Sequence, residues 1–117
     1  MTDATDRPRM LNPVPCDTTP DGVRMWLLER GTTMPDGCPV SAAHFTVEPG
    51  AVTELDVHDV VEVWTIMKGA GVVLSGSSRT EVGTGDSVFF ASQVPHQLLN
   101  ASTNPVDVFS IWWGWTE

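Results

Sequence analysis

Short runs of β-branched and aromatic residues alternate along the chain with turns rich in glycine, proline and aspartate. No long window carries the i, i+3, i+4, i+7 apolar spacing that marks an amphipathic helix. The pattern predicts nine extended segments: residues 23–28, 40–47, 53–58, 62–67, 71–74, 80–82, 87–90, 96–100 and 106–112. Because the connections are too short for crossover helices, we expect an all-β fold of antiparallel strands, either a sandwich or a closed barrel.

The length of 117 residues is close to the commonest size of one domain. Residues 1–22 are polar and contain several prolines, so we expect a loose arm or an edge strand there. Residues 23–117 are expected to form the barrel domain. At this size the chain can bury about two-thirds of its unfolded surface, which is enough for one core.

The net charge of −9, from six basic and fifteen acidic residues, excludes two classes of partner. A nucleic-acid binder needs a basic face to displace counterions from phosphates, and docking on anionic lipid needs one as well. The N-terminus shows no secretory signal, so a cytoplasmic location is expected. Cys16 and Cys38 lie far apart without a CxxC spacing and are expected to be free thiols.

Candidate chemistry is concentrated between residues 50 and 69, where Asp56, His58 and Glu62 are spaced by two and four residues. Side chains alternate between faces along a strand, so a reversal near residues 59–61 would aim all three at one interior. Two carboxylates and an imidazole aimed at one point are typical of a metal site, and His96 is the best further ligand.

The segment 50–69 resembles the first motif of the cupin family, written G(X)5HXH(X)3–4E(X)6G. Gly50, His58, Glu62 and Gly69 occupy the motif positions, and Asp56 stands where the family usually has its first histidine.

A second stretch, from residue 85 to residue 100, resembles the other cupin motif, G(X)5PXG(X)2H(X)3N. Gly85, His96 and Asn100 fall at its positions, whereas Ala91 and Gln93 replace its proline and second glycine. The resemblance implies a jelly-roll β-barrel that holds one divalent metal ion.

In this family His58, Glu62 and His96 would be metal ligands. Asp56 has three possible roles, namely a fourth ligand, the holder of a metal-bound water, or a general base. It could also be a carboxylate at the barrel mouth without any role. Asp56 and Glu62 are the candidate catalytic groups. Two imidazoles and one carboxylate with open positions suit Fe(II), and Zn(II), Mn(II) or Ni(II) would also be tolerated.

The walls of the pocket follow from strand parity, since residues two apart share a face. The residues expected to line it are His44, Thr46, Trp64, Ile66 and Leu98. Phe89, Phe90, Trp112, Trp113 and Trp115 are expected to be core or subunit interface. The adjacent Trp112 and Trp113 must point to opposite faces, so one of them could be buried by a second subunit in a homodimer.

Three functions follow from the resemblance. The first is a mononuclear non-haem iron dioxygenase or other oxygenase that acts on a small organic substrate. The second is a non-redox, metal-dependent isomerase, cyclase or rearrangement enzyme of secondary metabolism. The third is a non-catalytic barrel that binds a small molecule. Intact metal-ligating positions favour an enzyme over a purely structural barrel.

Overall fold

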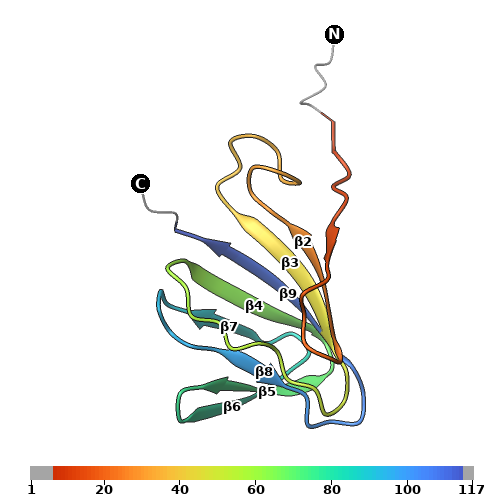
Figure 1. Ribbon diagram of the computed structural model, residues 1–117, viewed down its shortest axis with the longest axis vertical. Helices are drawn as coiled ribbons and strands as arrows, with labels where there is room; N and C mark the ends of the chain where they lie inside the picture. Colours follow the sequence, from red (N-terminus) through yellow and green to blue (C-terminus); the bar gives the residue numbers. More distant parts are fainter. Residues whose placement is uncertain (1–6, 115–117) are drawn as a thin grey trace.

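Residues 7–114 are described by the computed structural model, and within them the fold consists of strands, turns and loops (Figure 1). The strands are β1 (Val14–Cys16), β2 (Val23–Leu28), β3 (Ser41–Val47), β4 (Val61–Lys68), β5 (Ala70–Ser75), β6 (Ser78–Gly83), β7 (Ser87–Phe90), β8 (Gln97–Leu99) and β9 (Val106–Trp113). The prediction of an all-β chain is confirmed. None of these residues belongs to a helix that is long and apolar enough to cross a membrane.

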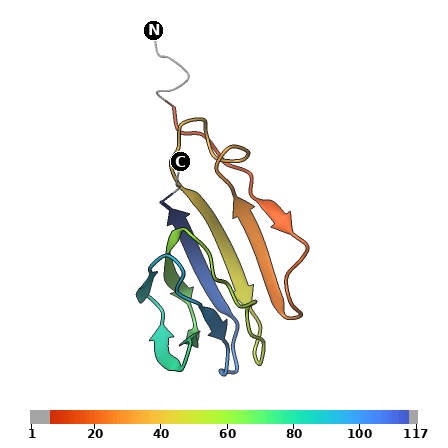
Figure 2. The same ribbon diagram turned by 60° about the vertical axis from the view of Figure 1, so that its left-hand side comes forward.

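The strands form two antiparallel sheets, one of six strands in the order β1-β2-β3-β9-β4-β7 and one of three in the order β6-β5-β8. Both views place the three-stranded sheet near the β4 and β7 end, while β1 and β2 form the opposite edge (Figures 1 and 2). The central strand β9 returns from the far end of the chain to pair with β3 and β4. This order is the jelly-roll arrangement expected for the fold.

The core lies between the sheets and follows the period-two alternation of the strands. On β4, Glu62, Trp64 and Ile66 are buried, whereas the residues between them are partly exposed. Eleven apolar side chains make up the core: Val23, Phe45, Val47, Trp64, Ile66, Val73, Val82, Phe90, Leu98, Val106 and Val108. Burying each such side chain contributes about 1.5–3 kcal/mol relative to leaving it in water.

Two of the residues expected in the pocket belong to this core instead. Ile66 and Leu98 are fully buried, with 0% of their surface exposed, and neither lines the main cavity. Parity placed them correctly on the inner face. They lie deeper along their strands than the candidate metal ligands, where the two sheets meet and side chains fill the space.

Segment 53–58 was expected to be a strand, but it makes only isolated bridges. Val52, directly before the segment, pairs with Leu99, and Asp56 within it pairs with His96. The segment therefore crosses the mouth of the barrel as a loop tied down at two points, and this exposes Leu55 and Val57. Asp56 still reaches the interior because its bridge fixes the direction of its side chain.

Gly69, the last glycine of the first motif, makes the tight connection between β4 and β5. Its φ of +100° is unfavourable for any residue with a side chain. A Cβ atom there would also lie 2.7 Å from the carbonyl oxygen of Pro105. The turn therefore needs glycine for both conformation and space.

The remaining predictions concern the ends of the chain and the cysteines. β1 lies at the edge of the six-stranded sheet, and the proposed domain boundary after residue 22 stays a prediction. Residues 1–6 of the expected arm, and Trp115, lie outside the described residues. Cys16 and Cys38 are free thiols, as expected.

Candidate metal centre

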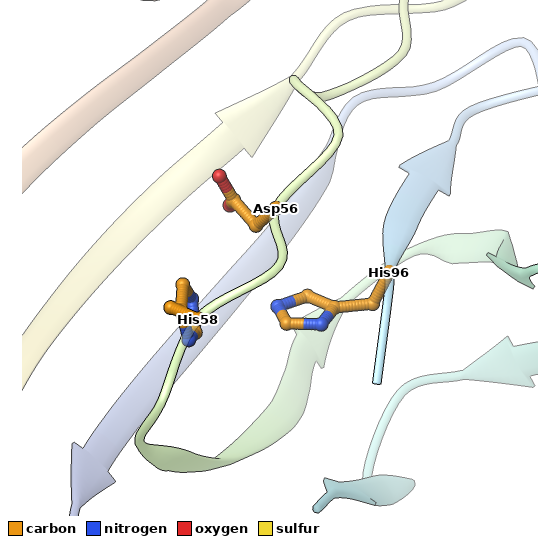
Figure 3. A group of neighbouring side chains, drawn as sticks. All are labelled: Asp56, His58 and His96. Carbon is orange, nitrogen blue, oxygen red and sulfur yellow. The ribbon is translucent and has the colours of Figure 1, made fainter. Parts of the chain in front are cut away.

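Asp56, His58 and His96 offer ligand atoms that all lie within 4.8 Å of one another (Figure 3). Asp56 and His58 come from the loop before β4, and His96 directly precedes β8. Figure 3 shows the ring of His96 extending toward His58. The structure thus brings together three of the four residues that the sequence singled out as metal ligands.

Glu62, the fourth, contacts both imidazoles through one oxygen. Its Oε1 lies 3.0 Å from Nε2 of His96 and 3.4 Å from Nε2 of His58. Its Oε2 accepts hydrogen bonds from the indole of Trp64, at 3.0 Å, and from the hydroxyl of Ser110. The two donors hold Oε2 away from the centre, so Oε1 is the oxygen that faces the histidines.

His96 is held in one orientation by its surroundings. Its ring stacks on Phe90 with the centroids 4.2 Å apart, and meets Trp64 edge to face. Its Nδ1 donates a hydrogen bond of 2.9 Å to the carbonyl oxygen of Val94. Because a carbonyl can only accept, this bond places a proton on Nδ1 and directs Nε2 toward the centre, as in many histidine ligands of metals.

The hydrogen bonds shift the pKa values of this pair in opposite directions. Burial acts to raise the pKa of Glu62, but the bonds from His96, Ser110 and Trp64 outweigh it, so that the pKa lies below its ordinary value. Burial acts to lower the pKa of His96, but the bonds to Glu62 and to the carbonyl of Val94 raise it above its ordinary value. Without a metal ion, the hydrogen bond between them therefore favours the charged form of each group.

Asp56 behaves differently because burial dominates. Loss of contact with water raises the pKa of Asp56 above its ordinary value, although the nearby His96 and His58 act in the opposite direction. A carboxyl group in this position takes up a proton more readily than a solvated one does, which suits acid–base work at the mouth of the barrel.

Asp56, His58 and Glu62 line a cavity of about 380 Å³, and His96 contacts this wall through Glu62. Its other walls are mostly apolar and come from β2, β3, β4, β9 and the loop before β4: Met25, Leu27, Ala43, Phe45, Thr53, Val60, Trp64, Ser110 and Trp112. Trp64, which the sequence analysis expects in the pocket, is among the residues that line this cavity. A cavity of this size and character accommodates a small organic molecule.

His44 and Thr46 do not line this cavity, so that prediction is wrong. Their strand presents Ala43 and Phe45 to the interior, and His44 stacks on Trp26 on the outer face of the sheet. Strand parity correctly places His44 and Thr46 on one face and Ala43 and Phe45 on the other, but it does not say which of these faces is the inner one. The second sheet decides this by covering the face that carries Phe45.

Sequence reasoning missed Ser110, Trp112 and the pair Met25 and Leu27 as lining residues. A lone serine within the otherwise apolar run 108–113 was the available signal for Ser110. Trp112 was expected to be core or interface, but its register opposite Glu62 directs it into the cavity. Its neighbour Trp113 points to the opposite face of the sheet, as expected for adjacent residues of one strand.

Comparison with known proteins agrees with this geometry. Residues 43–112 match the family model described as "Cupin domain", which covers more than half of the chain. Among solved structures, a Cupin 2 conserved barrel domain protein from Salinispora arenicola CNS-205 is 24% identical, with a TM-score of 0.71 over 79% of this chain and 76% of that one.

Two further structures share the fold. A predicted oxalate decarboxylase from Thermotoga maritima is 19% identical, with a TM-score of 0.73 over 88% of this chain and 92% of that one. A DMSP lyase from Ruegeria pomeroyi DSS-3 is 24% identical, with a TM-score of 0.70 over 83% of this chain and 49% of that one. The match to the family model, the jelly-roll fold and the cluster of histidines and carboxylates together show that the chain belongs to the cupin family.

Proposed function

We propose that this protein is a metal-dependent enzyme that binds one divalent metal ion, preferably Fe(II), and oxygenates a small organic substrate. The observation that carries the proposal is the convergence of His58, His96 and Asp56, of which Asp56 and His58 line a mostly apolar cavity. Two imidazoles with one or two carboxylates form a ligand set that suits ferrous iron and leaves positions open.

The residues present fit such an ion. Nδ1 of His58 is buried and has no hydrogen-bond partner among the described residues. Burying an unpaired polar atom costs free energy, and binding of a cation by Nε2 of the same ring, which lies 3.4 Å from Oε1 of Glu62, offsets part of that cost. Neither Cys16 nor Cys38 lines the cavity, so the donors available there are nitrogen and oxygen atoms.

Bound there, a ferrous ion would supply redox chemistry with dioxygen, whereas zinc or manganese would supply Lewis acidity. The protein's own residues do the remaining work. His58 and His96 would hold the ion, and the bonds from Trp64 and Ser110 to Oε2 of Glu62 leave Oε1 facing the two histidines. Asp56 is placed to take or release a proton at its carboxylate, and the apolar walls exclude water around the substrate.

A non-redox reaction, such as an isomerisation, cyclisation or elimination, is the second candidate. The raised pKa of Asp56, caused mainly by burial, supports it, because this carboxyl group faces the cavity and can exchange a proton with a substrate. Structures of similar fold also include a DMSP lyase and a predicted oxalate decarboxylase, whose names describe other chemistry than oxygenation. A barrel that only binds a small molecule is the third.

Elemental analysis of the purified protein, followed by anaerobic loading with Fe(II) and measurement of oxygen uptake, tests the proposal. We expect one metal ion per chain and uptake that depends on a small, mostly apolar substrate. Tightly bound zinc, or bound iron without oxygen uptake across a broad substrate panel, would favour the non-redox candidate. A protein that binds no metal would leave the binding barrel as the better account.

We also propose that two copies associate through the outer face of the six-stranded sheet. Met67, Phe89 and Phe109 are exposed on that face, and Trp26 stacks on His44 beside them. Register places Phe89 opposite Val63 and Phe109 opposite Thr65, so these side chains belong to one surface. Monomeric proteins rarely leave such a continuous apolar surface in water.

A further inference from the structure

One β-turn, residues 91–94, contacts both histidines of the candidate metal centre. The turn is closed by the amide of Val94, which donates to the carbonyl of Ala91 at 3.2 Å. The carbonyl of Val94 accepts the hydrogen bond from Nδ1 of His96, and the amide of Gln93 donates to the backbone carbonyl of His58 at 2.8 Å. The turn therefore connects the two segments that carry the imidazoles.

Gln93 occupies a conformation that its residue type disfavours. Its φ is +68°, and it is the only residue other than glycine with a positive φ among those described. It is the third residue of the turn, the position where a type II turn takes glycine. Gln93 also stands at the glycine position of the second cupin motif, so the backbone keeps the glycine conformation although the residue has changed.

The side chain of Gln93 makes a contact that glycine could not make. Its amide nitrogen donates a hydrogen bond to Oδ1 of Asp59, the residue that follows His58. Together with the backbone bond to His58, this gives Gln93 two attachments to the loop before β4. Gln93 therefore combines a strained backbone with a side-chain hydrogen bond to the loop that carries His58, in addition to its backbone bond to the same loop.

His58 depends on this attachment more than His96 does. His96 is clamped by Phe90, Trp64 and the carbonyl of Val94, whereas Nδ1 of His58 has no partner among the described residues. The His58 side chain is also 37% exposed. Metal-bound histidines are usually oriented by a hydrogen bond to the other ring nitrogen. Because His58 lacks such a bond, the placement of its ring depends on where its backbone is held.

We propose that Gln93 is a positioning residue that sets the place of His58 relative to His96, by holding the loop before β4 against the 91–94 turn. The proposal rests on the metal site proposed above. It assigns a role to a side chain that the family motif lacks at this position. It predicts that substitution by glycine, which relieves the backbone, harms the metal site without harming the fold.

Cobalt titration of Gln93→Gly tests this role, with the visible absorption of bound Co²⁺ as the signal. We expect the dissociation constant to rise about tenfold, the scale typical of lost supporting contacts around metal ligands. The absorption bands should change shape because His58 is no longer held, and the melting temperature of the metal-free protein should be unchanged or higher. Wild-type cobalt affinity and spectrum in Gln93→Gly would overturn the proposal.

Ser92→Gly is the matched control. Ser92 precedes Gln93 in the same turn, is exposed, and its side chain makes no hydrogen bond within residues 7–114. This variant adds the backbone freedom of glycine one position away and leaves both attachments of Gln93 in place. It should bind Co²⁺ as the wild type does. An equal loss of affinity in Ser92→Gly would show that general loop flexibility, and not Gln93, is responsible.

Two substitutions of Asp59 separate the hydrogen bond from the charge. Asp59→Asn removes the negative charge near the cation but keeps an oxygen that can accept from Gln93. Asp59→Ala removes both. The proposal predicts that Asp59→Ala weakens Co²⁺ binding more than Asp59→Asn does. Equal effects would attribute the role of Asp59 to charge alone and would contradict the proposed attachment.

Hydrogen exchange of the metal-free protein gives a readout that does not depend on the metal site. In Gln93→Gly, amides in segments 57–61 and 91–95 should exchange faster than in the wild type, whereas those of β3 and β9 should not. If the wild type binds no Co²⁺, the proposed function fails, and the exchange result still decides whether Gln93 holds the loop. Unchanged exchange in both segments would refute the proposal that Gln93 holds the loop before β4.

Discussion

Asp56 and His96 face each other across an antiparallel bridge in which each amide donates to the carbonyl of the other, at 3.2 and 3.1 Å. Residues that exchange both bonds project their side chains to the same face of a sheet. The bridge therefore joins the two cupin motifs at the candidate metal centre. It also explains how Asp56 reaches the interior from a segment that is otherwise a loop.

His58→Ala and His96→Ala should each reduce the metal content of the purified protein to background, because each removes an imidazole that faces the centre. The β-sheet signal in circular dichroism should stay unchanged. The third histidine offers a matched control, since His44 lies on the outer face against Trp26. His44→Ala should keep its metal, and full occupancy in either of the other two variants would refute the assigned site.

Asp56→Asn should lower turnover more than it lowers metal content. The amide keeps an oxygen that can face a cation but cannot accept a proton as a carboxylate does. Loss of a general acid or base typically reduces the rate by about a hundredfold or more. Steady-state kinetics on protein of measured metal content checks this. An unchanged rate per bound metal ion would remove Asp56 from the reaction.

The paired shifts in pKa predict how the stability of the metal-free protein depends on pH. The pKa of Glu62 is lowered by its hydrogen bonds. The stability that the charged Glu62 contributes to the fold is therefore present above about pH 4.5 and is lost as the pH falls through the lowered pKa. The pKa of His96 is raised. The stability that the charged His96 contributes to the fold is therefore fully present below about pH 6.5 and is lost as the pH rises through the raised pKa. The pair therefore stabilises the fold most between these limits.

Urea unfolding in EDTA, at a series of pH values, measures this effect as the difference between wild type and Glu62→Gln. The difference should be largest between about pH 4.5 and 6.5 and should shrink on both sides. A difference that keeps growing as the pH rises well above 6.5 would contradict the stabilising contact between His96 and Glu62. Added metal ion should reverse the loss at high pH, because it binds the deprotonated imidazole.

Leu98→Ala should destabilise the protein by about 2–5 kcal/mol, because the side chain is fully buried between the sheets and its removal leaves a cavity. Leu55→Ala is the matched control, since Leu55 is 58% exposed and should change stability by less than about 0.5 kcal/mol. Chemical denaturation of both variants compares them. Equal effects would show that Leu98 is not part of the core.

The proposed dimer predicts a sedimentation mass of twice the 12.7 kDa of one chain. Phe109→Glu should shift the protein toward the monomer, because it places a charge within the apolar outer face of the sheet. Thr80→Glu adds the same charge at an exposed position on β6, in the other sheet, and should leave the mass unchanged. A wild-type protein that sediments as a monomer would refute this association.

The sequence by itself determined the spacing of the strands and the identity of the candidate metal-ligating residues. The predicted range 23–28 coincides with β2, and most other strands begin or end within two residues of their predicted bounds. His58, Glu62 and His96 could be singled out because charged or ionisable side chains recur there at motif spacing. These features are local, since alternation and turn chemistry act over a few residues.

Only the tertiary structure decided which face of each strand is inside. Alternation separates His44 from Phe45, but the side that the second sheet covers sends Phe45 inward and leaves His44 outside. In the same way, only the folded chain brings Ser110 to Glu62 and forces Gln93 into a positive φ between two loops. Such relationships depend on pairing between residues far apart in the chain, which the pattern of a single strand does not encode.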